Sequence, residues 1–230
     1  MARLARVVVP GIPHHITQRG NRRAKVFDDD ESRRAYLAFV AQYARRYGVD
    51  VWAYSLMDNH VHWVVAPKAE TSLAQCFRGA HTRFSMAVNA ARGETGHLWQ
   101  NRYFSCPLDE THLWAAVRYV ERNPVRAGLV RRAEQYGWSS ARAHCGLRAD
   151  ALLSADFPPA GVVADWREWL REEDPAQSEA VRKNTYTGRP CGSLSFVERL
   201  EGLLRRTLQL QKVGRKRKRK PNETKGLFNE

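Results

Sequence analysis

The sequence has few cysteines, no long hydrophobic run and far fewer acidic than basic residues. Its four cysteines lie far apart along 230 residues and form no Cys-x-x-Cys pair, which argues against a cysteine zinc site and leaves no need for disulfides. Free thiols are typical of a reducing compartment, so we expect a cytoplasmic protein. The longest apolar runs, such as Val7-Val8-Val9, span a few residues, whereas a membrane helix needs about 20. Pro10 also interrupts that run too early for a secretory signal.

The charge balance indicates the kind of partner. Lys and Arg number 38 against 24 Asp and Glu, a net charge of +14 that favours a polyanion, most commonly nucleic acid. A membrane surface would need a long amphipathic helix with a clean apolar face, which the sequence does not show. Basic residues crowd positions 212–220, where like charges repel. We expect this tail to be disordered when free and to add non-specific DNA affinity, consistent with a nucleoid-associated protein.

The hydrophobic pattern predicts strands and helices in the order β-α-β-β-α-β-α. Such an order is typical of an α+β fold in which helices pack on an antiparallel, ferredoxin-like sheet. After about residue 147 the pattern weakens, and we expect a mainly helical C-terminal extension over 148–211, followed by the basic tail 212–230. The first domain would then be residues 1–147. Strands are predicted at 14–18, 51–56, 60–66 and 98–107, and helices at 31–47, 72–92, 111–123, 162–172 and 195–211.

The tripeptide His60-Val61-His62 is the sharpest local feature. In a strand, positions i and i+2 point to the same side, so the two imidazoles would lie next to each other. Two adjacent nitrogen ligands on a rigid strand form half of a divalent-metal site. The alternative is that both histidines are surface residues, and the tripeptide alone does not exclude it.

The helix predicted at 111–123 carries a second group of polar side chains. At about 100° per residue, its apolar residues form one stripe, and Tyr119 lies off the centre of that stripe, flanked by His112 and Asn123. A phenol can attack phosphorus when a metal ion polarises the phosphate. The alternative is an aromatic residue at the edge of the core with its hydroxyl in water.

Four ordered segments resemble a known family. Residues 57–62, Met-Asp-Asn-His-Val-His, are similar to the metal motif of the HUH single-strand transposases, where U is a hydrophobic residue. Residues 15–21, 98–104 and 119–130 resemble further blocks of one branch, the REP-associated tyrosine transposases. The resemblance covers about residues 13–144 and is far more specific than a His-x-His pair. A stretch at 186–190 also resembles a C-terminal element of that branch, without an assigned chemical role.

The resemblance implies a role for each matching position. His60 and His62 would bind a divalent metal, and Tyr119 would form a 5′-phosphotyrosine on single-stranded DNA. The third ligand would be Asn123, one helical turn after the tyrosine, although Pro124 disfavours helical geometry there and His112 is the substitute. Imidazoles favour softer ions than magnesium, whereas an amide oxygen, water and phosphate suit Mg or Mn. The resemblance implies Mg or Mn.

Further side chains are candidates for DNA contact. A basic turn follows the first predicted strand and would contact phosphates or base edges, unless it is simply solvated. Trp63 and Trp99 are either stacking platforms for unpaired bases or members of the core. Tyr103 is the rival nucleophile, but its apolar neighbour favours packing. The residues of the basic turn are Arg19, Asn21, Arg22 and Arg23.

The resemblance therefore implies a metal-dependent single-stranded DNA endonuclease and strand transferase acting on hairpin-forming repeats. One alternative is a repeat-binding protein that kept the fold but lost the chemistry. Another is an HUH replication or transfer initiator, although the chain has no phosphate-binding GxxxxGK loop. Related enzymes leave both a monomer and a homodimer open.

Overall fold

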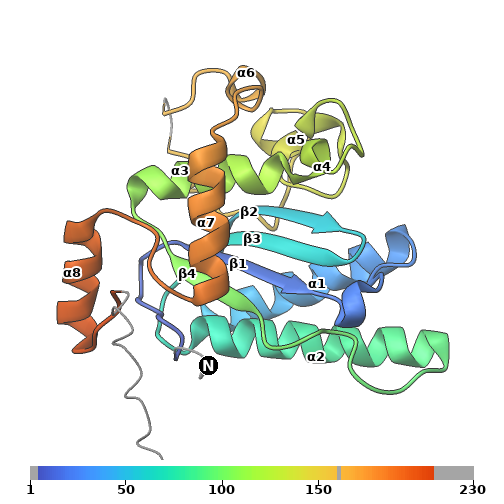
Figure 1. Ribbon diagram of the computed structural model, residues 1–230. Helices are drawn as coiled ribbons and strands as arrows, with labels where there is room; N and C mark the ends of the chain where they lie inside the picture. The colour runs from blue at the N-terminus through green and yellow to red at the C-terminus, as the bar shows by residue number, and fades with distance from the viewer. Residues whose placement is uncertain (1–4, 160–161, 210–230) are drawn as a thin grey trace, which may run out of the picture.

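A four-stranded antiparallel sheet lies at the centre of the computed structural model, which describes residues 5–159 and 162–209 (Figure 1). The strand order is β2-β3-β1-β4, and every neighbouring pair is antiparallel. This arrangement confirms the predicted ferredoxin-like α+β fold, with β2 and β3 joined by a tight hairpin. The strands are β1 (His14–Arg19), β2 (Val49–Met57), β3 (His60–Pro67) and β4 (Phe104–Pro107).

Two long helices cover one face of the sheet: α1 (Asp30–Tyr47) and α2 (Ser72–Arg92) (Figure 1). Asp29 caps α1 by accepting a hydrogen bond from the backbone N–H of Ser32, and the Ser32 hydroxyl is itself close to the Asp29 backbone. Gly48 ends α1 in the left-handed conformation, at φ 62°, which glycine adopts without steric cost. Both helices therefore begin and end within a residue of their predicted bounds.

The opposite face is covered by α3 (Glu110–Glu121) and by α7 (Pro175–Thr187). Figure 1 shows α7 crossing in front of the sheet. Shorter helices surround them. No helix in the part of the chain that the structure describes is long and apolar enough to cross a membrane. The short helices are η1 (Asn21–Arg23), α4 (Asn123–Arg126), η2 (Ala133–Gln135), α5 (Ala141–His144), α6 (Trp166–Trp169) and α8 (Leu194–Leu204).

Alternation along the strands divides the side chains between two cores. Ile16 and Trp63 lie in the core beneath α1 and α2. Val64 and Cys106 lie in the second core, together with Tyr119 of α3. Consequently the odd-numbered side of β1 and the even-numbered side of the first half of β3 face α3 and α7.

The fourth strand is shorter than predicted. Residues 98–103 are not part of β4 and instead bond to the end of β1 and the turn after it. The Asn21 N–H donates to the Leu98 carbonyl oxygen, and the Gln100 N–H donates to the Arg19 carbonyl oxygen. The aromatic and apolar residues of this segment are buried under α2 rather than in the sheet. Burial in a loop produces the same apolar pattern as burial in a strand, which explains the error.

The helices after residue 109 also differ from the prediction. Asp109, not Thr111, caps α3, and α3 ends at Glu121 because the chain turns before Pro124 and begins α4. The helix predicted at 162–172 is only Trp166–Trp169, and α8 ends at Leu204. The pattern missed α7 altogether, although Asp174 and Pro175 are ordinary helix-start residues. The basic tail lies outside the described residues, and the domain division at residue 147 stays a prediction.

The turn after β1 requires glycine at position 20. A Cβ there would lie 2.7 Å from Val26 Cγ1 and would also meet the backbone oxygen of Ala24. We expect Gly20→Ala to lower the free energy of unfolding by about 2 kcal/mol, measured by urea denaturation, because the backbone cannot move away cheaply. Gly137→Ala is the matched control, since nothing lies within 4 Å of its Cβ position. Equal stability of the two variants would contradict this reading of the turn.

Candidate active site

His60 and His62 begin β3 and project from the same face of the sheet, as the sequence predicted. Their ring centroids are 5.0 Å apart, with the planes nearly perpendicular. Burial lowers the pKa of His60 to about 4, helped by the charge of Arg19. Burial also lowers the pKa of His62 well below its usual value, together with the charges of its neighbours. Both imidazoles are therefore neutral at pH 7, the form in which histidine binds a metal.

Asn59 fixes the orientation of His60. The Nδ1 atom of His60 lies 2.7 Å from the side-chain oxygen of Asn59, whose amide nitrogen donates to the Arg23 carbonyl oxygen at 3.0 Å. Because an amide oxygen can only accept, His60 Nδ1 must carry the hydrogen. The Nε2 atom of His60 is then left with its lone pair available for a ligand bond.

A chain of hydrogen bonds fixes the orientation of His62 in the same way. The Thr185 hydroxyl donates its one hydrogen to the Val181 carbonyl oxygen at 2.7 Å, so it must accept from His15 Nδ1, also at 2.7 Å. Neutral His15 then offers the lone pair of Nε2 to His62 Nδ1, 3.0 Å away. Burial lowers the pKa of His15 to about 3, which is consistent with this neutral state. The Nε2 atom of His62 therefore also keeps its lone pair.

Tyr119 lies directly against these histidines. Its ring centroid is 5.4 Å from that of His62 and 5.6 Å from that of His15, and both contacts are edge-on. Arg126 lies on α4, and its guanidinium carbon is 4.6 Å from the Tyr119 ring centroid. Tyr119 is buried, with 6% of its surface exposed, so its ring belongs to the core and not to the water-exposed edge that the alternative described.

A buried carboxylate anchors α3 two residues after the tyrosine. Glu121 is fully buried and accepts hydrogen bonds from Ser140 Oγ at 2.5 Å, His144 Nδ1 at 2.6 Å and Trp166 Nε1 at 2.7 Å. These donors come from the segment before α5, from α5 and from α6. The position of Tyr119 over the sheet is therefore held by residues far along the sequence.

The two alternatives for a third ligand differ in their bonding, and Asn123 is the one hydrogen-bonded to Tyr119. The Asn123 amide nitrogen donates to the Tyr119 carbonyl oxygen at 3.3 Å, which leaves the amide oxygen as the free end. His112 lies two helical turns before the tyrosine, and its Nδ1 is bound to the Asp109 carboxylate at 2.6 Å. His112 is on the same side of α3 as Tyr119, as predicted, but Asp109 binds its imidazole. The choice between Asn123 and His112 as third ligand stays a prediction.

The donor set fits a divalent ion that also binds phosphate. Within residues 5–159 and 162–209, no group of three His, Cys, Asp or Glu side chains is placed to hold a metal ion. Two imidazole lone pairs and an amide oxygen fill at most half of an octahedral shell, and a hard ion completes it with water or phosphate oxygens.

A comparison with protein-family models decides the family. Residues 8–123 match the model described as "Transposase IS200 like". The chain belongs to the IS200-like transposase family. The match includes the histidine pair and Tyr119 and ends at Asn123.

Two solved structures are similar to this chain. A REP-associated tyrosine transposase bound to a REP hairpin is 18% identical, with a TM-score of 0.54 over 68% of this chain and 96% of that chain. At this identity the likeness supports the fold. A candidate transposase from Deinococcus radiodurans R1 is 16% identical, with a TM-score of 0.38 over 53% of this chain and 97% of that one. No curated protein sequence gives a significant match.

The residues predicted to contact DNA lie at the end of β1 and in the turn after it, next to the end of β3 that carries the histidines. Arg19 ends β1 directly opposite His60 in the strand register. Arg22 and Arg23 are exposed in the next turn, and both have positive φ, at 52° and 63°, an uncommon conformation for non-glycine residues. The turn is tied to the active site, because Asn59 bonds both Arg23 and His60. Asn21, by contrast, is partly buried and its backbone N–H holds residue 98.

Trp63, Trp99 and Tyr103, which lie outside this site, belong to the core. Trp63 and Trp99 are both buried beneath α2, which agrees with the core alternative. Tyr103 is also buried there, the Arg6 guanidinium carbon lies 3.7 Å from its ring centroid, and burial raises its pKa to about 12. Tyr103 is thus on the opposite face of the sheet from the histidines.

The sequence analysis missed three residues of the site: His15, Asn59 and Thr185. His15 is part of the segment 15–21 and shares a strand face with His62 only once the β1–β3 register is known. Asn59 stands next to the histidine pair inside the segment 57–62, but the resemblance assigned it no role. Thr185 lies in the helix that the pattern did not predict.

Proposed function

We propose that this protein is a metal-dependent single-stranded DNA endonuclease and strand transferase that acts on hairpin-forming repeats. The observation that carries the proposal is the contact of the Tyr119 ring with His62, whose Nε2 lone pair the hydrogen-bond chain leaves available. A nucleophile and a metal-binding pair, brought together from α3 and β3, are the two parts that phosphoryl transfer from DNA requires.

Each side chain has a definite task in this reaction. The Tyr119 oxygen forms a bond to the scissile phosphorus, and the bond from phosphorus to the 3′ oxygen breaks. The 3′ oxygen leaves as a hydroxyl after taking up a proton, while the tyrosine proton passes to solvent. The DNA 5′ end stays attached as a phosphotyrosine ester. A 3′ hydroxyl attacking this ester reverses the step and joins the strands, so no external energy source is needed.

His60, His62 and Asn123 would hold the divalent ion, Mg or Mn. When bound, the ion supplies charge that polarises the phosphate and offsets the negative charge that develops in the transition state. Arg126 lies over the Tyr119 ring, and Arg19 lies opposite His60, so both add positive charge where the phosphate would enter. One phosphate entering here would meet a nucleophile, a histidine pair able to hold the ion and two guanidinium groups.

The hydrogen-bond chain behind His62 predicts an effect of a distant threonine. Thr185→Val removes the acceptor of His15 Nδ1 and frees His15 and His62 to change tautomer. We expect the affinity for Mn to fall about tenfold, measured by calorimetry, because such outer partners typically contribute that much. Thr187→Val, on the exposed side of the same helix, is the control. Nitrogen NMR of metal-free protein should show His62 protonated at Nδ1 only when Thr185 is present, and unchanged affinity and tautomer in Thr185→Val would exclude this role.

The proposal is tested by incubating the protein with labelled repeat hairpins and Mn and looking for a covalent protein–DNA band. The solved relative was captured on a REP hairpin, which supports hairpins as the first substrates to try. A band that survives denaturation supports cleavage through a phosphotyrosine, the first half of strand transfer. Tight hairpin binding without any band would favour the alternative of a repeat-binding protein.

A further inference from the structure

Tyr119 and Glu121 lie on the two flanks of the apolar stripe of α3. Around the helix axis, Val120 is at about 100° and Val117 at about 160° from Tyr119, and both belong to the core between α3 and the sheet. Glu121 is at about 200°, beyond the far side of the stripe. Apolar contact has no preferred direction, so the stripe alone would let α3 rotate about its axis and carry Tyr119 away from His62.

The Glu121 carboxylate, which is fully buried, ties this second flank to the sheet. Ser140 Oγ and His144 Nδ1 lie 2.5 Å and 2.6 Å from one carboxylate oxygen, and Trp166 Nε1 lies 2.7 Å from the other. An ionised carboxylate can only accept, so all three groups donate to it. The Ser140 Oγ in turn accepts from the Tyr54 N–H on β2 at 3.0 Å, and the Ser140 N–H donates to the Tyr54 carbonyl oxygen, also at 3.0 Å.

A separate contact holds the start of α3. The Asp109 carboxylate accepts from the backbone N–H of His112 at 2.9 Å and from that of Ser193 at 2.7 Å. This contact fixes where the helix begins, whereas Glu121, two residues after Tyr119, fixes how far the helix is rotated. The donors to Glu121 all lie beyond residue 123, where the match to the family model ends.

We propose that Glu121 is a positioning residue for Tyr119: with its three donors, it sets the rotation of α3 so that the phenol oxygen faces a phosphate held at the histidine pair. This role rests on the proposed function for the identity of the reaction. Attack on phosphorus tolerates little displacement, because a shift of about 1 Å in a reacting group can cost about a hundredfold in rate. The region after residue 123 thus serves the chemical step.

Two pairs of variants test this role, and each pair compares the loss of one donor with a matched control. Ser140→Ala removes a hydroxyl that donates to Glu121, whereas Ser139→Ala removes that of its equally buried neighbour, which accepts from a backbone N–H instead. Trp166→Phe removes the N–H that donates to Glu121. Trp169→Phe makes the same change in the adjacent ring, whose centroid lies 4.9 Å from that of Trp166.

The rate of covalent adduct formation is measured at saturating hairpin and Mn, well below the melting temperature of each variant. It should fall about tenfold or more in Ser140→Ala and in Trp166→Phe, and should stay within about twofold of wild type in Ser139→Ala and Trp169→Phe. The hairpin Kd should stay within about twofold in all four variants, because contacts to the DNA backbone charge and to the bases supply the affinity.

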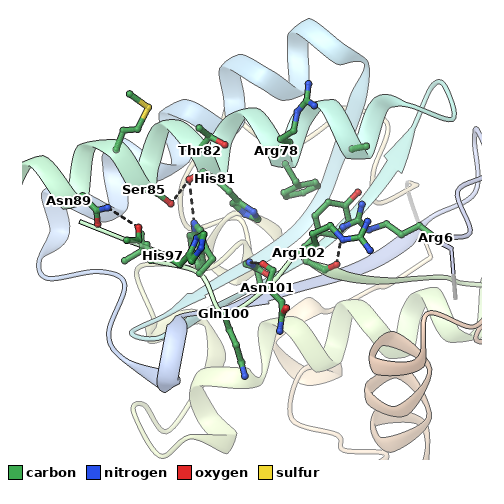
Figure 2. A pocket seen from close by; sticks show the side chains of 18 residues that line it. Arg6, Arg78, His81, Thr82, Ser85, Asn89, His97, Gln100, Asn101 and Arg102 are labelled. Carbon is green, nitrogen blue, oxygen red and sulfur yellow. Dashed lines mark hydrogen bonds between the residues drawn. The ribbon is translucent and has the colours of Figure 1, made fainter. Parts of the chain in front are cut away.

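Fluorine NMR of protein labelled with 3-fluorotyrosine reports the rotation without any reaction. The Tyr119 ring is edge-on to His62 and His15, so its signal should move when α3 rotates. Tyr103 is the internal reference, because it lies on the other face of the sheet, in the wall of a cavity of about 810 Å³ between α2 and residues 96–103 (Figure 2). The Tyr119→Phe and Tyr103→Phe variants assign the two signals.

The outcomes separate this role from the proposed function. A Tyr119 signal that moves in both donor variants, together with slower adduct formation and an unmoved Tyr103 signal, supports the positioning role. An unchanged adduct rate in both donor variants, or an equal loss of rate in the controls, overturns it. If the wild-type protein forms no adduct but the Tyr119 signal moves in the donor variants alone, Glu121 still sets the position of Tyr119 and the catalytic proposal fails.

Discussion

Replacing Tyr119 by phenylalanine is expected to abolish covalent attachment to DNA, by at least about a thousandfold, while hairpin binding survives. The phenol oxygen is the attacking atom in the proposed reaction, and no other group can take over its bond to phosphorus. The substitution removes one oxygen and almost no volume. Because the ring itself packs on His62 and His15, the fold and the metal site should remain intact. The measurement is the covalent band on denaturing gels with labelled hairpin and Mn.

Tyr103→Phe is the matched control for this experiment. Tyr103 is also a buried tyrosine, but its raised pKa and its place beneath α2 make it a poor nucleophile. Its hydroxyl has no hydrogen-bond partner among the described residues, so its loss should cost little stability. The variant should form the adduct at close to the wild-type rate. An adduct that persists in Tyr119→Phe and disappears in Tyr103→Phe would reverse the assignment.

The second large effect is expected at the histidine pair. His60→Ala or His62→Ala should reduce adduct formation at least about a hundredfold and remove measurable Mn binding, with hairpin affinity changed only a few-fold. Contacts to the DNA backbone charge and to the bases supply the affinity, whereas the ion stabilises the transition state. Calorimetry with Mn and anisotropy with the hairpin separate the two quantities. Unchanged adduct formation by the double variant would rule out the metal site.

The third ligand is tested by comparing Asn123 with His112 in the same assays. Asn123→Ala should weaken Mn binding about tenfold, because it removes the amide oxygen beside Tyr119. His112→Ala should leave Mn binding unchanged, since its imidazole is bound to Asp109 at the start of α3. The opposite result would return His112 to the metal site.

The sequence predicted the parts of this site that depend on local spacing. The placement of His60 and His62 on one side of a strand follows from alternation, and the family motif connected them to Tyr119. The four-stranded fold followed from the order of strong helix and strand patterns. These features are each encoded within a few consecutive residues, so they can be recognised without the structure.

The residues that support the site could not be predicted in this way. His15 is 47 positions from His62, and Thr185 is 170 positions from His15, so only the strand register and the packing of α7 bring them together. The α7 helix itself has a largely polar sequence with a weak apolar stripe, which gives little periodic signal. Residues 98–103 misled the prediction in the opposite direction, because their apolar side chains bury in a loop.

The most direct test of the account is to find which tyrosine carries the DNA. Trypsin cuts after Arg102, Arg118 and Arg122, so residues 103–118 and 119–122 are released as separate peptides. The wild-type protein, incubated with hairpin and Mn and then digested with nuclease and trypsin, should carry a nucleotide phosphate on residues 119–122 by mass spectrometry. A nucleotide found on residues 103–118, or on any peptide other than 119–122, would contradict the account.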